Sequence, residues 1–426
     1  MAKTKKRRLT AAEKKDRTFK SQVRSIFRKS GFTRAPDVSD REFTFEGTTS
    51  DFDDAFVYEN LIVLCEYTLS KATYTGQHFK NKIHLYKKIY DEPKQFLELY
   101  RERFPKFDKS ISTNYHKDQL KLQIAYFSEH ELTSAHSGLE PRVATAWWGV
   151  IQYFRGLTNT VERSARYELL HFLGVSPSEV GEKGTFDTGE AETPHPGSLL
   201  PEAHSEFPEG YKVISFYVTP NALLKRAYVL RHDGWRDSDG LYQRMIDKRK
   251  ISSIRSHLKE KRRVFVNNVV VTLPPDTRLD DSGGEEIKPA AIGETTSVDV
   301  RLRDRPNSVG IIDGQHRIFA YYEGVNDDRD IAAFRNRQNI LATGIIYPKN
   351  TSDEDKMKFE AELFLEINSN QNSAKSDLKQ AISVTVRPFS VDSLGKRVVN
   401  DLSKQGPLEG LLQRNYFETS LLKRLV

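Results

Sequence analysis

Residues 51–69 are DFDDAFVYENLIVLCEYTL, and this stretch decides the fold of the first part of the chain. It holds two runs rich in β-branched and aromatic residues, FDDAFVY and LIVLCEYTL, a composition typical of strands. The dipeptide Glu59-Asn60 between the runs indicates a tight turn, so we expect an antiparallel hairpin. Because side chains alternate along a strand, Glu66 and Thr68 would share one face of it.

The sequence on both sides of the hairpin predicts a mixed α/β domain over residues 10–175. Upstream, Thr10 and Glu13 form a capping-box pattern, and apolar residues recur at helical spacing from Phe19 to Phe27, until Gly31 ends the run. Downstream, the pattern is helical over residues 78–104, strand-like over 122–127, and helical again in two segments over 144–172.

Acidic side chains lie where the two hairpin strands would meet. Asp51, Asp53 and Asp54 start the first strand, and Glu66 comes near the end of the second. A tight turn places these ends side by side, and two carboxylates at one point supply the oxygen ligands that a hard divalent cation prefers. Such a cation polarises a phosphodiester and lowers the pKa of a bound water, which suits nucleic-acid hydrolysis. The alternative is that these acidic residues only face solvent.

This arrangement resembles the PD-(D/E)xK restriction-endonuclease-like nucleases, in which a helix precedes a hairpin, an Asp enters the hairpin and Glu-x-Lys ends its second strand. The resemblance implies that Asp54 and Glu66 are ligands of Mg²⁺ or Mn²⁺. It places Thr68 where the family has its catalytic lysine, so Lys71 or Lys82 would have to take over that role. Three interpretations stay open: an active nuclease, an inactive DNA-binding relative, and a hairpin that matches the pattern by chance.

A change of composition divides the chain. Residues 176–210 are acidic and rich in Pro and Gly, with little periodicity, which predicts a linker. Residues 211–426 then show strand-like segments at 211–218, 264–273 and 339–347 and a basic helical segment at 241–262. The sequence therefore predicts two mixed α/β domains, 10–175 and 211–426, with a basic arm and first helix in residues 1–30.

The most informative stretch of the second domain is residues 308–324, SVGIIDGQHRIFAYYEG. A β-rich run stops at the turn dipeptide Asp313-Gly314, and a helical pattern follows. Free backbone N–H groups and the helix dipole favour an anion at such a helix start, and His316 and Arg317 add donors. The alternative is a strand-turn-helix in which Arg317 only pairs with Asp313.

Residues 313–317, DGQHR, reproduce the signature of the DGQHR family, which includes the DndB-type proteins associated with bacterial DNA phosphorothioation. That family is related to the ParB-like fold, whose G-x-x-R-x-x-A phosphate motif is matched by Gly314, Arg317 and Ala320. The resemblance covers about residues 210–426 and implies a domain that binds DNA or a nucleotide such as ATP. It also implies that Asp313 holds a metal ion or orients Arg317. The phosphate-facing turn would consist of Gly314, Gln315, His316 and Arg317.

The net charge of +7 is concentrated at the N-terminus. Residues 1–30 hold twelve Lys or Arg against two acidic residues, a net charge of +10, and the rest of the chain sums to −3. Such an arm favours a polyanion such as DNA, bound in a salt-dependent manner, although it would also serve as a solubilising tail. The basic helix of the second domain could likewise follow a DNA backbone. The residues expected to contact nucleic acid are Lys5, Lys6, Arg7, Arg8, Arg244 and Arg249.

Composition argues against a membrane or secreted protein. Of 426 residues 37% are hydrophobic and 29% charged, and no run of about eighteen apolar residues occurs. The single cysteine, Cys65, excludes an intramolecular disulfide, and the basic N-terminus lacks the apolar stretch of a secretory signal. We therefore expect a cytoplasmic protein.

Two hypotheses combine these observations. In the first, the chain is a DNA-targeting enzyme of a bacterial DNA-modification or anti-phage defence system, and nucleotide or DNA bound at the DGQHR turn gates metal-dependent cleavage by the N-terminal domain. In the second, it is a catalytically inactive DNA-binding regulator or accessory subunit of a phosphorothioation-type system. NTP hydrolysis by the DGQHR domain is a further option, and a homo-oligomer or a defence-system partner protein fits either hypothesis.

Overall fold

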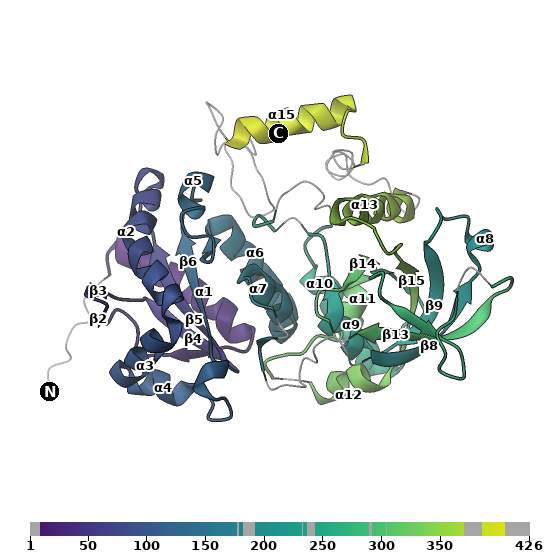
Figure 1. Cartoon of the computed structure of the whole chain (residues 1–426), viewed down its shortest axis with the longest axis horizontal. Coiled ribbons are helices and arrows are strands. Elements are labelled where there is room, and N and C mark those ends of the chain that lie inside the picture. Colours follow the sequence, from purple (N-terminus) through teal and green to yellow (C-terminus); the bar gives the residue numbers. More distant parts are fainter. Residues whose placement is uncertain are drawn as a thin grey trace. The chain divides into compact units, whose positions relative to one another are not determined.

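The computed structural model describes residues 9–176, 179–181, 192–231, 233–236, 243–288, 292–303, 305–326, 328–369 and 386–404. The chain is a mixed α/β protein, as its sequence predicts. It divides into two compact units: unit 1 comprises residues 1–158 and 172–175, and unit 2 comprises residues 159–171 and 176–426. In Figure 1 the first unit is coloured purple to blue and the second mainly teal, green and yellow.

Unit 1 is built on a five-stranded sheet in the order β1-β4-β5-β6-β7. The predicted hairpin forms β4 (Asp54–Tyr58) and β5 (Leu61–Thr68), which run antiparallel across a two-residue turn. β5, β6 and β7 are parallel, and β1 pairs antiparallel with β4 at the edge. The other elements are α1 (Ala11–Lys29), β1 (Thr33–Ala35), β2 (Phe43–Phe45), β3 (Thr48–Ser50), α2 (Ala72–Asp91), α3 (Pro93–Arg103), α4 (Pro105–Ser110), β6 (Lys121–Ser128), α5 (Ser134–Ser137), β7 (Ala144–Ala146) and α6 (Trp148–Val161).

Helices cover both faces of this sheet. On one face, Phe27 of α1 stacks on Phe56 of β4 with ring centroids 4.3 Å apart. On the other face, Leu64 of β5 and Phe79 of α2 belong to one buried hydrophobic cluster, to which α3 also contributes. Because side chains alternate along β5, Glu66 lies on the same face as Leu64. These two faces are called the α1 face and the α2 face below.

Unit 2 is built on an eight-stranded sheet in the order β10-β14-β11-β15-β9-β8-β13-β12. β14 is parallel to β10 and β11 is parallel to β15, whereas the other neighbours are antiparallel. Helices α9 to α12 pack together, and α13 packs against β14. The elements are α7 (Arg166–Phe172), β8 (Glu192–Leu200), α8 (Glu202–Ser205), β9 (Lys212–Val218), α9 (Pro220–Arg226), β10 (Ala227–Tyr228), α10 (Lys248–Lys261), β11 (Val269–Leu273), β12 (Arg278–Asp280), β13 (Thr296–Arg303), β14 (Val309–Asp313), α11 (Gln315–Phe319), α12 (Arg329–Arg337), β15 (Ile340–Ile346), α13 (Asp353–Ser369) and α15 (Val391–Lys404).

The structure differs from the predicted linker over residues 176–210, because residues 192–200 form β8 inside the sheet of unit 2. β8 pairs with β13 from Glu192 to Leu199 but with β9 only from Gly197 to Leu200. Pro194 and Pro196 lie in the half that has one partner strand, where a proline without an N–H group is tolerated on the open side. Residues 159–171 also differ from the prediction, since they belong to unit 2.

Other predicted elements have shifted boundaries. The helix expected over residues 78–104 is two helices, α2 and α3, and Pro93 begins the second. The basic helix expected from residue 241 begins at Lys248, where the side chain of Asp247 caps its first turn. In the part of the chain that the structure describes, no helix is long and apolar enough to cross a membrane.

Candidate active site on the α2 face of unit 1

An ammonium group joins two carboxylates on the α2 face. Lys82, which projects from α2, places its Nζ atom 3.1 Å from an oxygen of Glu66 on β5. The same Nζ atom lies 3.1 Å from Oδ1 of Asp51, in the segment that enters the hairpin. It also donates to the hydroxyl of Ser50 at 3.1 Å. Three segments far apart in the sequence therefore bring two carboxylates and one cation to a single point.

Burial sets the electrostatics of this cluster. The side chain of Glu66 is only 6% exposed, and this burial raises the pKa of Glu66 to about 8, with Lys82 opposing the shift and Asp53 adding to it. Burial lowers the pKa of Lys82, but Glu66 and Asp51 outweigh that effect, so the pKa of Lys82 is raised and its ammonium stays charged. Asp51 is 44% exposed, so only Glu66 is poorly solvated; with a pKa of about 8 it holds a proton near pH 7, which a bound divalent cation would displace.

Neutral polar groups complete the surroundings of Glu66. Nε2 of His78 lies 3.8 Å from a carboxylate oxygen of Glu66, and Nδ1 of the same ring hydrogen-bonds the hydroxyl of Tyr126 at 2.9 Å. Burial, followed by the charge of Lys82, lowers the pKa of His78, so its imidazole is neutral near pH 7. Thr68, in the position of the family lysine, is buried and donates its hydroxyl to Ser70.

Asp54 does not join this cluster. It is fully buried on the α1 face, where one carboxylate oxygen accepts a hydrogen bond from Nε of Arg24 at 2.7 Å and the other from Nε of Arg34 at 2.5 Å. The expectation that Asp54 and Glu66 share a metal ion is therefore not met by the geometry. Their side chains lie on opposite faces of the hairpin, and both oxygens of Asp54 are already paired.

The register of the hairpin explains this difference. Counting back from the two-residue turn pairs position 54 with 65, so Asp54 and Glu66 fall on opposite faces of the hairpin. The ladder ends at this pair, and the backbone N–H of Asp53 donates to the carbonyl of Cys65. The Asp53 carboxylate pairs with Lys20 of α1 at 2.8 Å and accepts a hydrogen bond from the backbone of Tyr67. The length of the turn could have predicted from the sequence that Asp54 faces away from Glu66. Nothing in the sequence indicated that Lys20, Arg24 and Arg34 would pair with the aspartates.

Of the two lysines proposed as substitutes for the family lysine, only Lys82 reaches the carboxylates. Lys71 is exposed at the N-cap of α2. Within the described residues, no three side chains of the His, Cys, Asp and Glu types converge in a way that could hold a metal ion. Any cation on the α2 face would therefore have two carboxylates, Glu66 and Asp51, as its nearest protein ligands.

The DGQHR turn of unit 2 is a strand-turn-helix, as predicted. Nη2 of Arg317 donates to the carboxylate of Asp313 at 2.7 Å, which is the pairing that the alternative interpretation expected. Gly314 has a φ of 96° and is the N-cap residue of α11, which begins at Gln315. A Cβ atom at this position would lie 2.6 Å from Cγ1 of Val269, so both the backbone conformation and the packing require glycine.

His316 is turned toward the neighbouring helix α10. Its Nε2 accepts a hydrogen bond from the backbone N–H of Asp247 at 3.0 Å. Burial, followed by the charges of Lys250 and Arg231, lowers the pKa of His316 to about 4. The imidazole is therefore neutral near pH 7, and its Nε2 atom acts as an acceptor, whereas the sequence suggested a donor.

Two guanidinium groups beside the turn have N–H groups without a partner among the described residues. Arg231 is 1% exposed, donates from Nε to Gln315 at 3.2 Å and from Nη1 to Glu168 at 2.9 Å, and leaves Nη2 unsatisfied. The Nε atom of Arg317 is likewise buried and has no hydrogen-bond partner among the described residues. Because unsatisfied buried donors are unfavourable, an anion near the turn would stabilise it.

The residues expected to contact nucleic acid are only partly described. Lys5, Lys6, Arg7 and Arg8 lie outside the described residues. Arg244 and Arg249 are both exposed; the carbonyl of Arg244 accepts a hydrogen bond from Gln315, and Arg249 lies in the first turn of α10. The exposure of both guanidinium groups leaves them accessible to a phosphate backbone.

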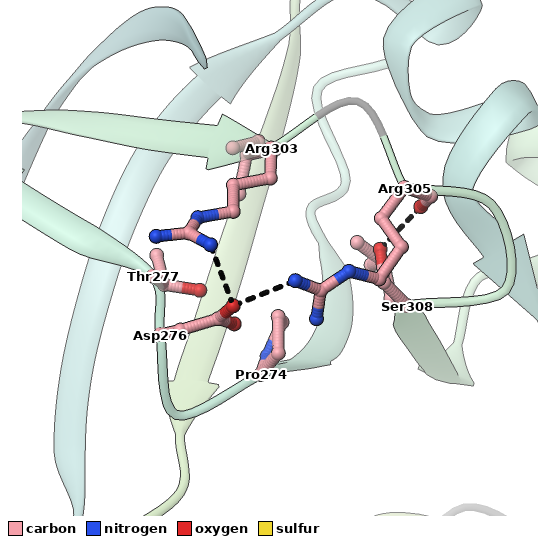
Figure 2. A pocket seen from close by; sticks show the side chains of 8 residues that line it. Pro274, Asp276, Thr277, Arg303, Arg305 and Ser308 are labelled. Atoms are coloured by element: carbon pink, nitrogen blue, oxygen red, sulfur yellow. Dashed lines mark hydrogen bonds and ion pairs between the residues drawn. The ribbon is translucent and has the colours of Figure 1, made fainter. Parts of the chain in front are cut away.

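A second cluster of arginines in unit 2 is not a ligand site. Figure 2 shows Arg303 and Arg305 pointing toward Asp276, whose Oδ2 lies 3.4 Å and 2.8 Å from them. The cavity beside them measures about 10 Å³, roughly the space of one water molecule. It is too small for a nucleotide.

Comparison of the chain with protein-family models, with curated proteins and with solved structures finds no match. The function is therefore argued from the geometry of the chain's own residues.

Proposed function

We propose that unit 1 is a metal-dependent DNA nuclease of the restriction-endonuclease-like kind, with Glu66, Asp51 and Lys82 in its active site. The observation that carries this proposal is the Lys82 ammonium 3.1 Å from both carboxylates. Lys82 thus brings an ammonium group to the carboxylates, although this chain has Thr68 where the family pattern has its lysine. The order of helix α1, hairpin β4–β5, helix α2 and parallel strand β6 supports the same assignment.

The donor set suits Mg²⁺ or Mn²⁺. Mg²⁺ is commonly held by one or two carboxylates while it keeps several waters, so Glu66 and Asp51 are a sufficient protein contribution. The Lys82 ammonium already marks the point on which both carboxylates converge. When bound, such a cation would polarise the phosphodiester and lower the pKa of the attacking water.

The protein's own groups have separate roles in this proposal. Glu66 and Asp51 would hold the cation, whereas the Asp53 carboxylate is paired with Lys20 of α1. Lys82 would donate hydrogen bonds to a non-bridging phosphate oxygen and stabilise the charge that develops as the water oxygen bonds to phosphorus and the bond from phosphorus to the deoxyribose oxygen breaks. The proton of the water passes to solvent, which protonates the leaving oxygen. His78 is hydrogen-bonded to Tyr126 and lies 3.8 Å from Glu66, too far for a direct hydrogen bond.

The test is a cleavage assay. Purified protein is incubated with supercoiled plasmid and Mg²⁺ or Mn²⁺, beside Glu66→Gln and the matched control Asp40→Asn, which removes an exposed carboxylate of unit 1. Nicked or linear product that disappears only with Glu66→Gln supports the nuclease. An intact plasmid under every condition overturns it and favours the DNA-binding regulator of a modification system.

We further propose that the turn at residues 313–317 binds a phosphate of DNA or of a nucleotide such as ATP and thereby gates unit 1. The unsatisfied Nη2 of Arg231 and Nε of Arg317 favour this second role. The DGQHR resemblance would place such a protein in DNA modification or anti-phage defence. Calorimetric titration of ATP into wild type and Arg317→Ala tests the site, since equal affinities would count against it.

A further inference from the structure

A groove runs along the α1 face of unit 1, between helix α1 and the edge strand β1. It encloses about 620 Å³ and is lined mainly by arginine and hydroxyl side chains. Phe32 and Phe56 form its floor, and both are buried. The groove therefore exposes polar and cationic groups over an apolar base, on the face of the sheet opposite Glu66.

Four guanidinium groups line this groove against a single carboxylate. Arg17, Arg24 and Arg28 come from α1, and Arg34 comes from β1. Asp54 accepts from the Nε atoms of Arg24 and Arg34, so these five side chains carry a net charge of four minus one, or +3. Arg17 and Arg28 are exposed, and Arg24 and Arg34 keep about a third of their side chains exposed, at 32% and 33%.

Asp54 fixes the direction of the two central arginines. One of its oxygens accepts a hydrogen bond from Nε of Arg24, and the other accepts one from Nε of Arg34. Nη2 of Arg34 also donates to the hydroxyl of Ser39 at 2.6 Å. A guanidinium that is anchored through Nε can still present its Nη groups to a phosphate. The buried carboxylate that the sequence suggested as a metal ligand thus acts as a positioning residue for cations.

The arginines of α1 are spaced for an extended polyanion. Positions 17, 24 and 28 follow one face of the helix, and the rise of 1.5 Å per residue separates the first from the last by about 16 Å. A nucleic-acid strand that advances about 3.4 Å per nucleotide would cross this length in four or five steps. A single phosphate would use only part of the groove.

We propose that this groove binds the sugar-phosphate backbone of a nucleic-acid strand. The fork of each guanidinium matches phosphate oxygens, and the two aromatic rings of the floor are buried, so they are not open to a lipid chain. In the sequence, residues 3–8 add five further Lys or Arg before α1. The inference rests on the proposed action on DNA and gives it a second substrate contact.

The test measures binding of a fluorescently labelled oligo-dT by anisotropy over a series of salt concentrations. The groove variant is Arg17→Gln with Arg28→Gln, because both residues are exposed and neither pairs with Asp54. The control is Lys106→Gln with Lys109→Gln, exposed lysines of α4 that remove the same charge elsewhere on unit 1.

The groove variant should bind about tenfold more weakly at low salt, and the slope of log affinity against log salt should fall by about 1.4, since each lost contact to a single strand removes about 0.7. The control should keep the wild-type slope. Equal losses in both variants, or no loss in the groove variant, would overturn the proposal. Because the readout is binding, an intact plasmid in the cleavage assay would defeat the nuclease and leave this result standing.

Discussion

Lys82 on α2 and Glu66 on β5 form an ion pair with an N–O distance of 3.1 Å, sixteen positions apart in the sequence. The pair lies on the α2 face, where burial leaves 6% of the Glu66 side chain exposed. Helix α2, which follows the hairpin, thus brings a lysine to the end of β5. At this end of the strand the residue in the position of the family lysine is Thr68. This relationship makes a helix-borne lysine testable as the functional equivalent of a strand-borne one.

Lys82→Met should abolish cleavage, while Lys80→Met should not. Methionine keeps much of the aliphatic stem but removes the ammonium that would stabilise charge on the phosphate, so we expect the rate of plasmid nicking to fall by about 100-fold or more. Lys80 is an exposed residue of the same helix and controls for the loss of charge. A Lys82→Met protein that cleaves at the wild-type rate would remove the lysine from the mechanism.

Asp54→Asn should lower stability, because it leaves Arg24 and Arg34 beside a neutral group. Removing one partner of a fully buried ion pair costs about 3–5 kcal/mol, and we expect about 1–3 kcal/mol here, since water screens the partly exposed arginines. Urea denaturation measures the change in the free energy of unfolding. Asp40→Asn, an exposed carboxylate, should change it by about 0.5 kcal/mol or less. Equal effects would mean that Asp54 is not an anchor.

Local patterns predicted the helix at residues 11–29 and the β4–β5 hairpin well, because both depend on short-range rules. The Thr10 capping box forms with both of its hydrogen bonds, and the turn lies at Glu59-Asn60 as expected. The same two-residue turn also determined that Asp54 would face away from Glu66. Counting residues from the turn was enough to show that Asp54 and Glu66 lie on opposite faces. This count would have argued against a shared metal ion before the structure was known.

Long-range pairing was not predictable in the same way. β8 contains two prolines and follows an acidic segment, so its composition resembles a linker, and only its pairing with the distant strands β13 and β9 makes it a strand. Arg24 and Arg34 lie 30 and 20 positions from Asp54, and nothing local indicated that they would neutralise it. Lys82 was one of two candidate lysines, and only the packing of α2 on the sheet distinguishes it from Lys71.

Gly314→Ala should destabilise unit 2 by more than Gly284→Ala does. Both glycines have positive φ, 96° and 84°, so both alanines carry backbone strain of about 1–2 kcal/mol. Only at position 314 would the new Cβ atom also meet a neighbour, Val269, at 2.6 Å; at position 284 nothing lies within 4 Å. We expect an extra loss of about 1–3 kcal/mol in urea denaturation. Equal losses would show that the turn relaxes around the methyl group.

His316→Gln should remove part of the acid sensitivity of unit 2. The pKa of His316 is lowered from 6.5 to about 4, so between these values the unfolded chain binds a proton that the native imidazole does not. The stability that this group contributes is complete above pH 6.5 and is lost as pH falls toward 4, by at most about 1.4 kcal/mol per pH unit. Glutamine does not titrate, and its side-chain oxygen can still accept the hydrogen bond from Asp247.

The measurement for His316→Gln is the free energy of unfolding of both proteins between pH 4 and pH 6.5. Because the pKa of His195 is also lowered to about 4, only the difference between the two proteins is informative. Parallel pH profiles would show that His316 titrates normally and that its ring is solvated in the native state.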